Sequence, residues 1–307
     1  MDFLIGWLAI IPSYTTPLLL ASLGLIICER AGVLNLGAEG FMAVGAMSGA
    51  IAALSGVDPW LALTAGIGAG VALAILFGLS TVVLRVDHTL AGLAVVAIGL
   101  GVTGVIGRPY MQKTFAGIST FGDLFGIGRD TALGRFMAVQ DPVTVALPVL
   151  VLVVWWWMAM SRSGLRLRAV GENPAAADIA GIDVQLVQLG AVIASGALCG
   201  LAGSYLSVAT SHVWVEGMVA SRGWVAVALV IFARWNPARA LVGALVFGSA
   251  DALVPRLQAV GADIPVYLTM TLPYLLTLAV LVAGSVFGRR SGEPAFLGRI
   301  YLRQDKH

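Results

Sequence analysis

The sequence contains very little charge. Only 11% of its 307 residues are Asp, Glu, Lys or Arg, whereas soluble globular domains carry about 25%. Hydrophobic residues make up 59% of the chain, and its mean hydropathy is +0.95. The apolar runs are long and continuous, without the period-2 alternation of barrel strands. We therefore predict an all-α, polytopic bundle of transmembrane helices.

Several kinds of functional site are also missing. The sequence has no GxxxxGK[ST] phosphate loop, no nucleophile–base constellation and no metal-ligand spacing. Its two cysteines, Cys28 and Cys199, lie in or beside apolar segments, which indicates buried free thiols. The net charge of +2 suggests no nucleic-acid partner. We expect a protein that is not an enzyme and that binds no cofactor or metal itself.

The apolar runs give about nine candidate spans (roughly 8–10), because a span needs about 20 mostly apolar residues. We treat 1–307 as one transmembrane domain. The seventh span is short, and Pro12 and Pro17 interrupt the first, which we expect to be retained rather than cleaved as a signal peptide. The candidates are 3–27, 36–55, 59–84, 89–107, 142–160, 185–209, 221–233, 237–255 and 266–287.

A polar stretch, 161–184, interrupts this pattern in mid-chain. Within it, Asn173 is a favourable helix N-cap, Pro174 suits the first helical position, and Gly181 ends the helical run. These residues predict a helix of about seven residues, or about 10 Å. The stretch therefore reads as a short, capped helix at the membrane surface between two spans.

The distribution of basic residues predicts the orientation of the bundle. If 161–184 is cytoplasmic, alternation of the spans places 28–34, 85–88, 234–239 and the tail 288–307 on the same side. Together these segments hold 12 of the 18 Lys and Arg residues. Because basic residues concentrate in cytoplasmic loops, this bias supports a cytoplasmic position for 161–184.

Four polar residues in or beside apolar runs are candidates for lining a solute pathway: Asn35, Glu39, Ser195 and Asp251. Polar groups at membrane depth usually face a cavity or a partner. The alternative is structural: Glu39 would pair with an Arg or cap helix N–H groups, Asp251 would bond a neighbouring helix, and Ser195 would bond its own helix. Charge at mid-membrane is sparse, so no proton relay is evident.

Three ordered stretches resemble a known family. GLRLRAVGENPAAADIAGIDV, within 161–184, resembles the coupling loop of ABC-importer permeases of the ribose and branched-chain amino-acid type. The nucleoside-uptake branch of that superfamily has stretches similar to ERAGVLNLGAEGFMAVGA at 29–46 and to RGWVAVALVIFARWNPARALVGALVFGSAD at 222–251. The three cover about a quarter of the chain.

The resemblance implies the fold of an ABC importer permease in the bacterial inner membrane. The chain would be the shorter of two permease subunits, with a tandem ABC ATPase that carries ATP and Mg and an extracytoplasmic solute-binding lipoprotein as partners. The expected solute is a nucleoside or a related purine or pyrimidine. The residues implied to couple to the ATPase are Arg168, Gly171, Glu172, Asn173, Pro174, Ala175, Ala176, Asp178 and Gly181.

Other interpretations remain open at this point. A permease for a simple sugar such as ribose belongs to the same superfamily. A stand-alone secondary transporter would need transport by this polypeptide alone, and the sparse membrane charge argues against it. A membrane scaffold without transport gives no reason for the capped helix. Trp214, Phe41 and Tyr274 could stack on a base, although packing is the simpler role for each.

Overall fold

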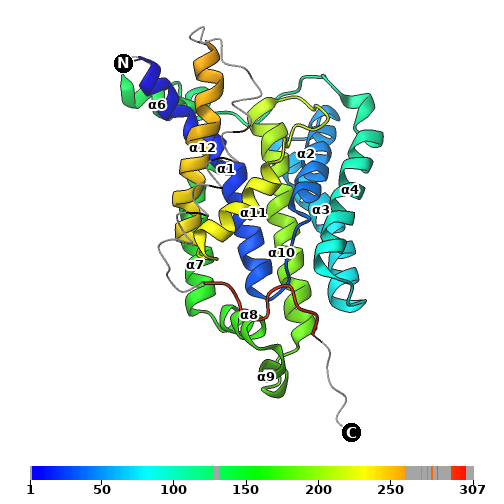
Figure 1. Cartoon of the computed structure of the whole chain (residues 1–307). Helices are drawn as coiled ribbons and strands as arrows, with labels where there is room; N and C mark the ends of the chain where they lie inside the picture. Colours follow the sequence, from blue (N-terminus) through cyan, green and yellow to red (C-terminus); the bar gives the residue numbers. More distant parts are fainter. Residues whose placement is uncertain are drawn as a thin grey trace.

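The computed structural model shows a bundle of helices (Figure 1) and describes residues 2–127, 131–259 and 292–301, together with the single residues 271, 275, 278 and 282. Within these residues the regular structure is helical, apart from an isolated β-bridge between Thr114 and Val213. The longer helices are α1 (Asp2–Arg30), α2 (Ala38–Leu54), α3 (Pro59–Gly78), α4 (His88–Ile106), α7 (Pro142–Met160), α8 (Arg162–Glu172), α10 (Val184–Tyr205), α11 (Arg222–Ala233) and α12 (Pro237–Ala259).

Eight of the nine predicted spans coincide with a helix, and α1 runs without a break through Pro12 and Pro17. Short π-helical segments, η1 (Leu79–Val83) and η3 (Leu206–Ser211), extend α3 and α10. Two spans begin at an Asp–Pro pair: Asp58 accepts a hydrogen bond from Trp60 N, and Asp141 accepts one from Thr144 N. An N-cap followed by proline is a strong start signal, which explains why these boundaries were predicted well.

The predicted number of spans agrees less well with the structure than the predicted helix positions do. Six helices in the described part of the chain are long and apolar enough to cross a membrane, whereas α2, with 17 residues, and α11, with 12, are shorter. Twelve residues extend only about 18 Å, which is less than the bilayer core of about 30 Å. Of the predicted ninth span, 266–287, the structure describes only residues 271, 275, 278 and 282, and of the tail 288–307 it describes 292–301.

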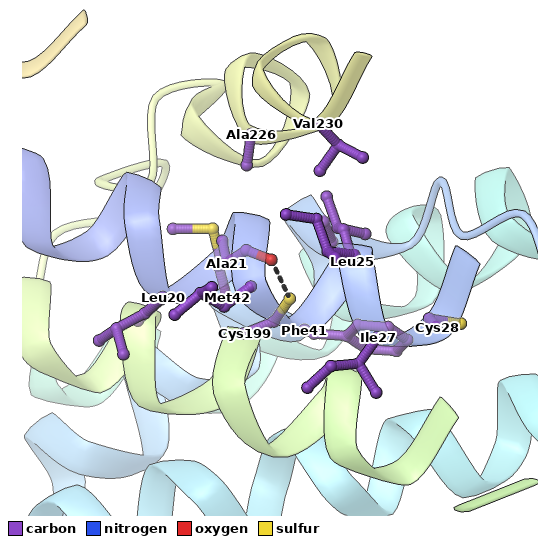
Figure 2. Close-up of a cluster of buried hydrophobic side chains, with 14 of the residues drawn as sticks. Leu20, Ala21, Leu25, Ile27, Cys28, Phe41, Met42, Cys199, Ala226 and Val230 are labelled. Atoms are coloured by element: carbon purple, nitrogen blue, oxygen red, sulfur yellow. Dashed lines mark hydrogen bonds between the residues drawn. The ribbon is translucent and has the colours of Figure 1, made fainter. Parts of the chain in front are cut away.

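The centre of the bundle is held together by small residues. A Cβ on Gly45 of α2 would lie 2.7 Å from the Cα of Gly200 in α10, and a Cβ on Gly70 of α3 would lie 2.8 Å from the same atom. These glycines therefore allow α2 and α3 to approach the backbone of α10, as small residues do in membrane bundles. Cys199, on the same helix, is a buried free thiol close to Ala21 of α1 (Figure 2).

Segments from across the chain meet at the end of the bundle that carries α8 and α9 (Pro174–Ile179), the lower end in Figure 1. We call this the α9 end. Gly171 packs against the backbone of Arg30, whose side chain bonds Trp235 O. Arg85 lines a pocket of about 470 Å³ beside α9, and Phe296 N bonds Gly171 O. The described parts of the five segments predicted to share one side of the membrane therefore share one end of the bundle, the tail being described over 292–301.

Two parts of the chain contain more helix than predicted. The stretch 162–172 forms α8, although only the shorter helix after it was expected. The loop 108–140 contains η2 (Arg108–Tyr110), α5 (Phe121–Phe125) and α6 (Ala132–Val139). The buried residues of α8 follow a helical spacing: Gly164, Leu167, Val170 and Gly171. The sequence therefore contains a helical pattern of apolar residues between the charged ones.

Candidate functional site

The short helix α9 has the predicted caps. Asn173 Oδ1 accepts a hydrogen bond from Ala176 N at 3.0 Å, and Pro174 takes the first helical position. Gly181, just beyond the helix, has a φ of +82°, a left-handed conformation that favours glycine. The local sequence therefore fixes both ends of α9.

α9 has one face against the protein and one face in the open. Ala177 is buried with Val170 and Val184 in a small apolar cluster. On the other side Ala175 and Ala176 are exposed, and Ile179 is 84% exposed. The exposed face of α9 therefore carries one branched apolar side chain and two alanines. Ile179 was not among the predicted coupling residues, although its position in the helix after Asn173 was evident.

The remaining predicted coupling residues surround α9 without forming one surface. Arg168 donates to Ala159 O at the end of α7, so its side chain stabilises that helix terminus. Gly171 is buried, and Glu172 Oε2 accepts a hydrogen bond from Ala295 N at 3.3 Å. Asp178 accepts one from the Tyr301 hydroxyl at 3.1 Å.

Glu39 binds the beginning of α11. Its two carboxylate oxygens accept hydrogen bonds from Ser221 N at 2.9 Å and Gly223 N at 2.8 Å, and the residue is only 7% exposed. The first N–H groups of a helix have no partner within the helix, and a carboxylate there is favoured by the helix dipole. Glu39 therefore caps helix N–H groups, the structural alternative considered for it, and the helix that it caps is α11 rather than its own helix α2.

The other end of α11 is held by Glu29 and Arg30, the last two residues of α1. The buried carboxylate of Glu29 accepts a hydrogen bond from Trp235 Nε1 at 2.5 Å, and Arg30 Nε donates to Trp235 O at 3.1 Å. The segment 29–39 therefore binds α11 at both ends. Sequence reasoning missed this arrangement, because nothing in the 29–46 motif points to Trp235.

Two of the predicted pathway residues contact each other inside the bundle. Asn35 Nδ2 donates to Ser195 Oγ at 3.0 Å, and both residues are fully buried. Asn35 Oδ1 accepts from Gly37 N, so it forms a turn just before α2, whose N-cap is Gly37. The pair brings an uncharged amide and a hydroxyl together between the α1–α2 turn and α10.

The fourth pathway candidate, Asp251 of α12, lies beside Arg222 at the start of α11. The closest nitrogen and oxygen are 3.5 Å apart, and both side chains are more than a fifth exposed. Arg222 also donates to Met218 O and Val219 O. An ion pair at membrane depth needs water or protein around it, so this surface of α11 and α12 is unsuited to lipid.

A polar cluster that sequence reasoning did not single out lies at the opposite end of the bundle. Tyr205 and Thr144 both donate to Asp141 Oδ2, at 2.6 and 2.8 Å, and Thr144 Oγ1 lies 3.1 Å from Thr16 Oγ1. The cluster links α1, α7 and α10. The Asp–Pro pair at 141–142 marks the helix start in the sequence, but nothing there indicates the partners.

The aromatic candidates are packing residues where the structure describes them. Trp214 is buried beside Ala46 and Met47, and Phe41 is buried edge-to-face with Phe77. Tyr274 lies outside the described residues. In the part of the chain that the structure covers, no cluster of His, Cys, Asp or Glu has the arrangement of a metal site.

Comparisons with known proteins agree with this architecture. A family model described as a permease component of branched-chain amino acid transport systems matches residues 8–281. A putative glucose ABC transporter permease of Haloferax volcanii is 38% identical, with 92% of each chain covered. A nucleoside ABC transporter permease of Lactococcus lactis is 32% identical over 87% of this chain and 88% of that protein.

Two further matches extend this picture. A guanosine ABC transporter permease of Bacillus subtilis is 31% identical over 94% of each chain. Among solved structures, an inward-facing putative metal-chelate type ABC transporter aligns with a TM-score of 0.51 and 16% identity, over 90% of this chain and 85% of that one. At that identity the structural match supports the fold alone.

Proposed function

The chain belongs to the family of permease components of branched-chain amino acid transport systems, and on that premise we propose that it carries nucleosides. It is an ABC transporter permease subunit and a multi-pass protein of the cytoplasmic membrane. The observation that carries the nucleoside assignment is the similarity, over most of the chain, to two relatives named for nucleoside and guanosine transport.

A sugar is the second candidate solute, because a relative named as a putative glucose permease shares 38% of its residues with this chain. Both solute classes are neutral and polar. The buried pair Asn35–Ser195 offers uncharged polar atoms of the kind that would contact either class. Uptake of labelled guanosine and glucose by the assembled transporter separates the two: guanosine uptake that excess glucose does not reduce is expected, and the reverse result would replace nucleoside by sugar.

The proposed transporter contains more than this chain. ATP is hydrolysed by a separate ATPase subunit, for which a tandem arrangement fits the resemblance, and a solute-binding lipoprotein delivers the solute. The second permease subunit is a different, longer chain. Its contact region includes the partly exposed ion pair Arg222–Asp251, which is unsuited to lipid. Guanosine uptake by liposomes that contain this polypeptide alone, without ATP, would refute the ATP-driven assembly.

The exposed face of α9 is the proposed contact with the ATPase. A cysteine that replaces Ala176 on this face should form a crosslink to the ATPase subunit in the assembled transporter. The matched control is a cysteine in place of Ala132, which is also an exposed alanine but lies on α6 at the opposite end of the bundle. A normally assembled complex that crosslinks at neither position, or equally at both, contradicts the coupling role of α9.

Asn35 and Ser195 are the proposed contacts with the solute. The Ser195→Ala substitution should raise the KM for uptake while the affinity of the solute-binding protein stays unchanged. Ser207→Ala is the matched control, because the Ser207 hydroxyl is equally buried but bonds Ala46 O. Equal uptake kinetics in the two variants would remove Ser195 from the pathway. Glu39 and Asp251 act through α11 in this scheme, as the groups that hold its first turn.

A further inference from the structure

The segment 292–301, which we call the C-terminal segment, returns to the α9 end of the bundle. It is drawn in red in Figure 1, where it passes along α8 and toward α9. Phe296 N donates to Gly171 O at 3.0 Å, and Gly298 N donates to Gly32 O at 3.1 Å. The segment thus bridges the end of α8 and the turn after α1.

The same segment contacts both ends of α9. Ala295 N bonds the carboxylate of Glu172, just before the helix, and the Tyr301 hydroxyl bonds Asp178 Oδ2 near its end. The ring of Tyr301 packs against the cluster beneath α9 that contains Ala177. Phe296 meets Tyr301 edge-to-face, with ring centroids 6.4 Å apart, so the two aromatic residues support each other.

A helix as short as α9 needs such support. It has six residues, and isolated helices shorter than about 12–15 residues are marginal in water. Its direction must therefore come from its neighbours. The buried side chains of α9 itself are Pro174 and Ala177, two small residues with little apolar area. The hydrogen bond from Tyr301 to Asp178 and the packing of the Tyr301 ring against the Ala177 cluster therefore add to a small buried face.

We propose that the C-terminal segment is a part of the apparatus that couples this permease to its ATPase, with Tyr301 as the positioning residue that holds α9 through Asp178. This inference rests on the proposed docking of the ATPase at α9. A displacement of the ATPase can move the bundle only if α9 does not turn independently of α8. The C-terminal segment joins the two helices to the turn after α1, so a force on α9 reaches the bundle instead of tilting one short helix.

The test is the Tyr301→Phe substitution in the full transporter, with Tyr301→Ala as a second variant that also removes the ring. Tyr110→Phe is the matched control, since Tyr110 is part-buried and lies outside the α9 end. Loss of one such hydrogen bond changes a local equilibrium by about fivefold. We therefore expect about fivefold less solute carried per ATP hydrolysed in Tyr301→Phe and a larger loss in Tyr301→Ala, at unchanged complex yield and unchanged basal ATP hydrolysis.

Hydrogen exchange on the permease gives a readout that needs no ATPase: the amides of α9 should exchange about fivefold faster in Tyr301→Phe. Wild-type transport per ATP in both Tyr301 variants would overturn the inference. So would a fall in transport that matches a fall in assembled complex, because that result indicates a purely structural role. If Ala176→Cys crosslinks to the ATPase while the Tyr301 variants behave as wild type, only this inference fails. If no crosslink forms, the coupling role of α9 fails with it.

Discussion

Glu39 offers the sharpest test of how α11 is held. In the Glu39→Gln variant the side chain keeps its shape, but only one oxygen remains to accept from Ser221 N and Gly223 N. The other N–H faces an NH₂ group and loses its acceptor. A hydrogen bond to a charged group contributes about 1.5–3 kcal/mol, and the carboxylate at a helix start adds about 0.3–1 kcal/mol. The first turn of α11 should therefore lose about 2–4 kcal/mol of local stability.

Hydrogen exchange measured on the protein in detergent or nanodiscs reports this loss directly. A local destabilisation of about 2 kcal/mol corresponds to about 30-fold faster exchange, and the change should be confined to the first turn of α11. Glu216→Gln is the matched control, because Glu216 lies exposed in the segment that precedes the helix. Its effect should stay within about 0.5 kcal/mol. Equal exchange at Gly223 in the two variants would refute the role of Glu39 as the holder of α11.

Two further substitutions test the packing of the bundle by thermal unfolding in detergent. Gly70→Ala places a Cβ against the backbone of α10 and should lower the free energy of unfolding by about 1–3 kcal/mol. The control, Gly68→Ala, has open space around the new Cβ on the same helix and should be neutral or slightly stabilising. Equal effects of the two substitutions would contradict the close approach of α3 to α10. Trp235→Phe removes the donor to the buried Glu29 carboxylate and should lower the free energy of unfolding by about 1.5–3 kcal/mol. The control, Trp60→Phe at an exposed position, should change it very little. Identical melting temperatures of the two variants would mean that the hydrogen bond contributes nothing to stability.

The spans were predictable because their signals are local. Apolar runs of about 20 residues and start signals such as Asp58–Pro59 and Asn173–Pro174 depend only on neighbours in the chain. The helix α8 was missed for a related reason: its charged residues resembled a solvated loop, and its buried positions become evident only when the spacing from Gly164 to Gly171 is counted.

The contacts that define the site depend on residues far apart in the sequence. Glu39 and Ser221 are 182 positions apart, and Glu29 and Trp235 are 206 positions apart. A single sequence gives the chemical need of a buried carboxylate for donors, but it does not say which N–H groups supply them. The stretches 29–46 and 222–251 were two separate motifs of the family resemblance. The structure shows that they contact each other, through Glu39 and Gly223 and through Glu29 and Trp235.

This pairing gives the proposed coupling a physical route through the molecule. Gly171, at the end of α8, lies against the backbone of Arg30, and the side chain of Arg30 bonds Trp235, two residues beyond the end of α11. The chain then runs from Arg30 to Glu39, which binds the start of the same helix. Because α11 is too short to span the membrane and is held at both ends by one segment, a shift of α8 against that segment would move α11 as a unit. Coupling between distant sites needs an element that both sites can bias. We propose α11 as that element, and the exchange experiment on Glu39→Gln measures how firmly it is held in the arrangement described here.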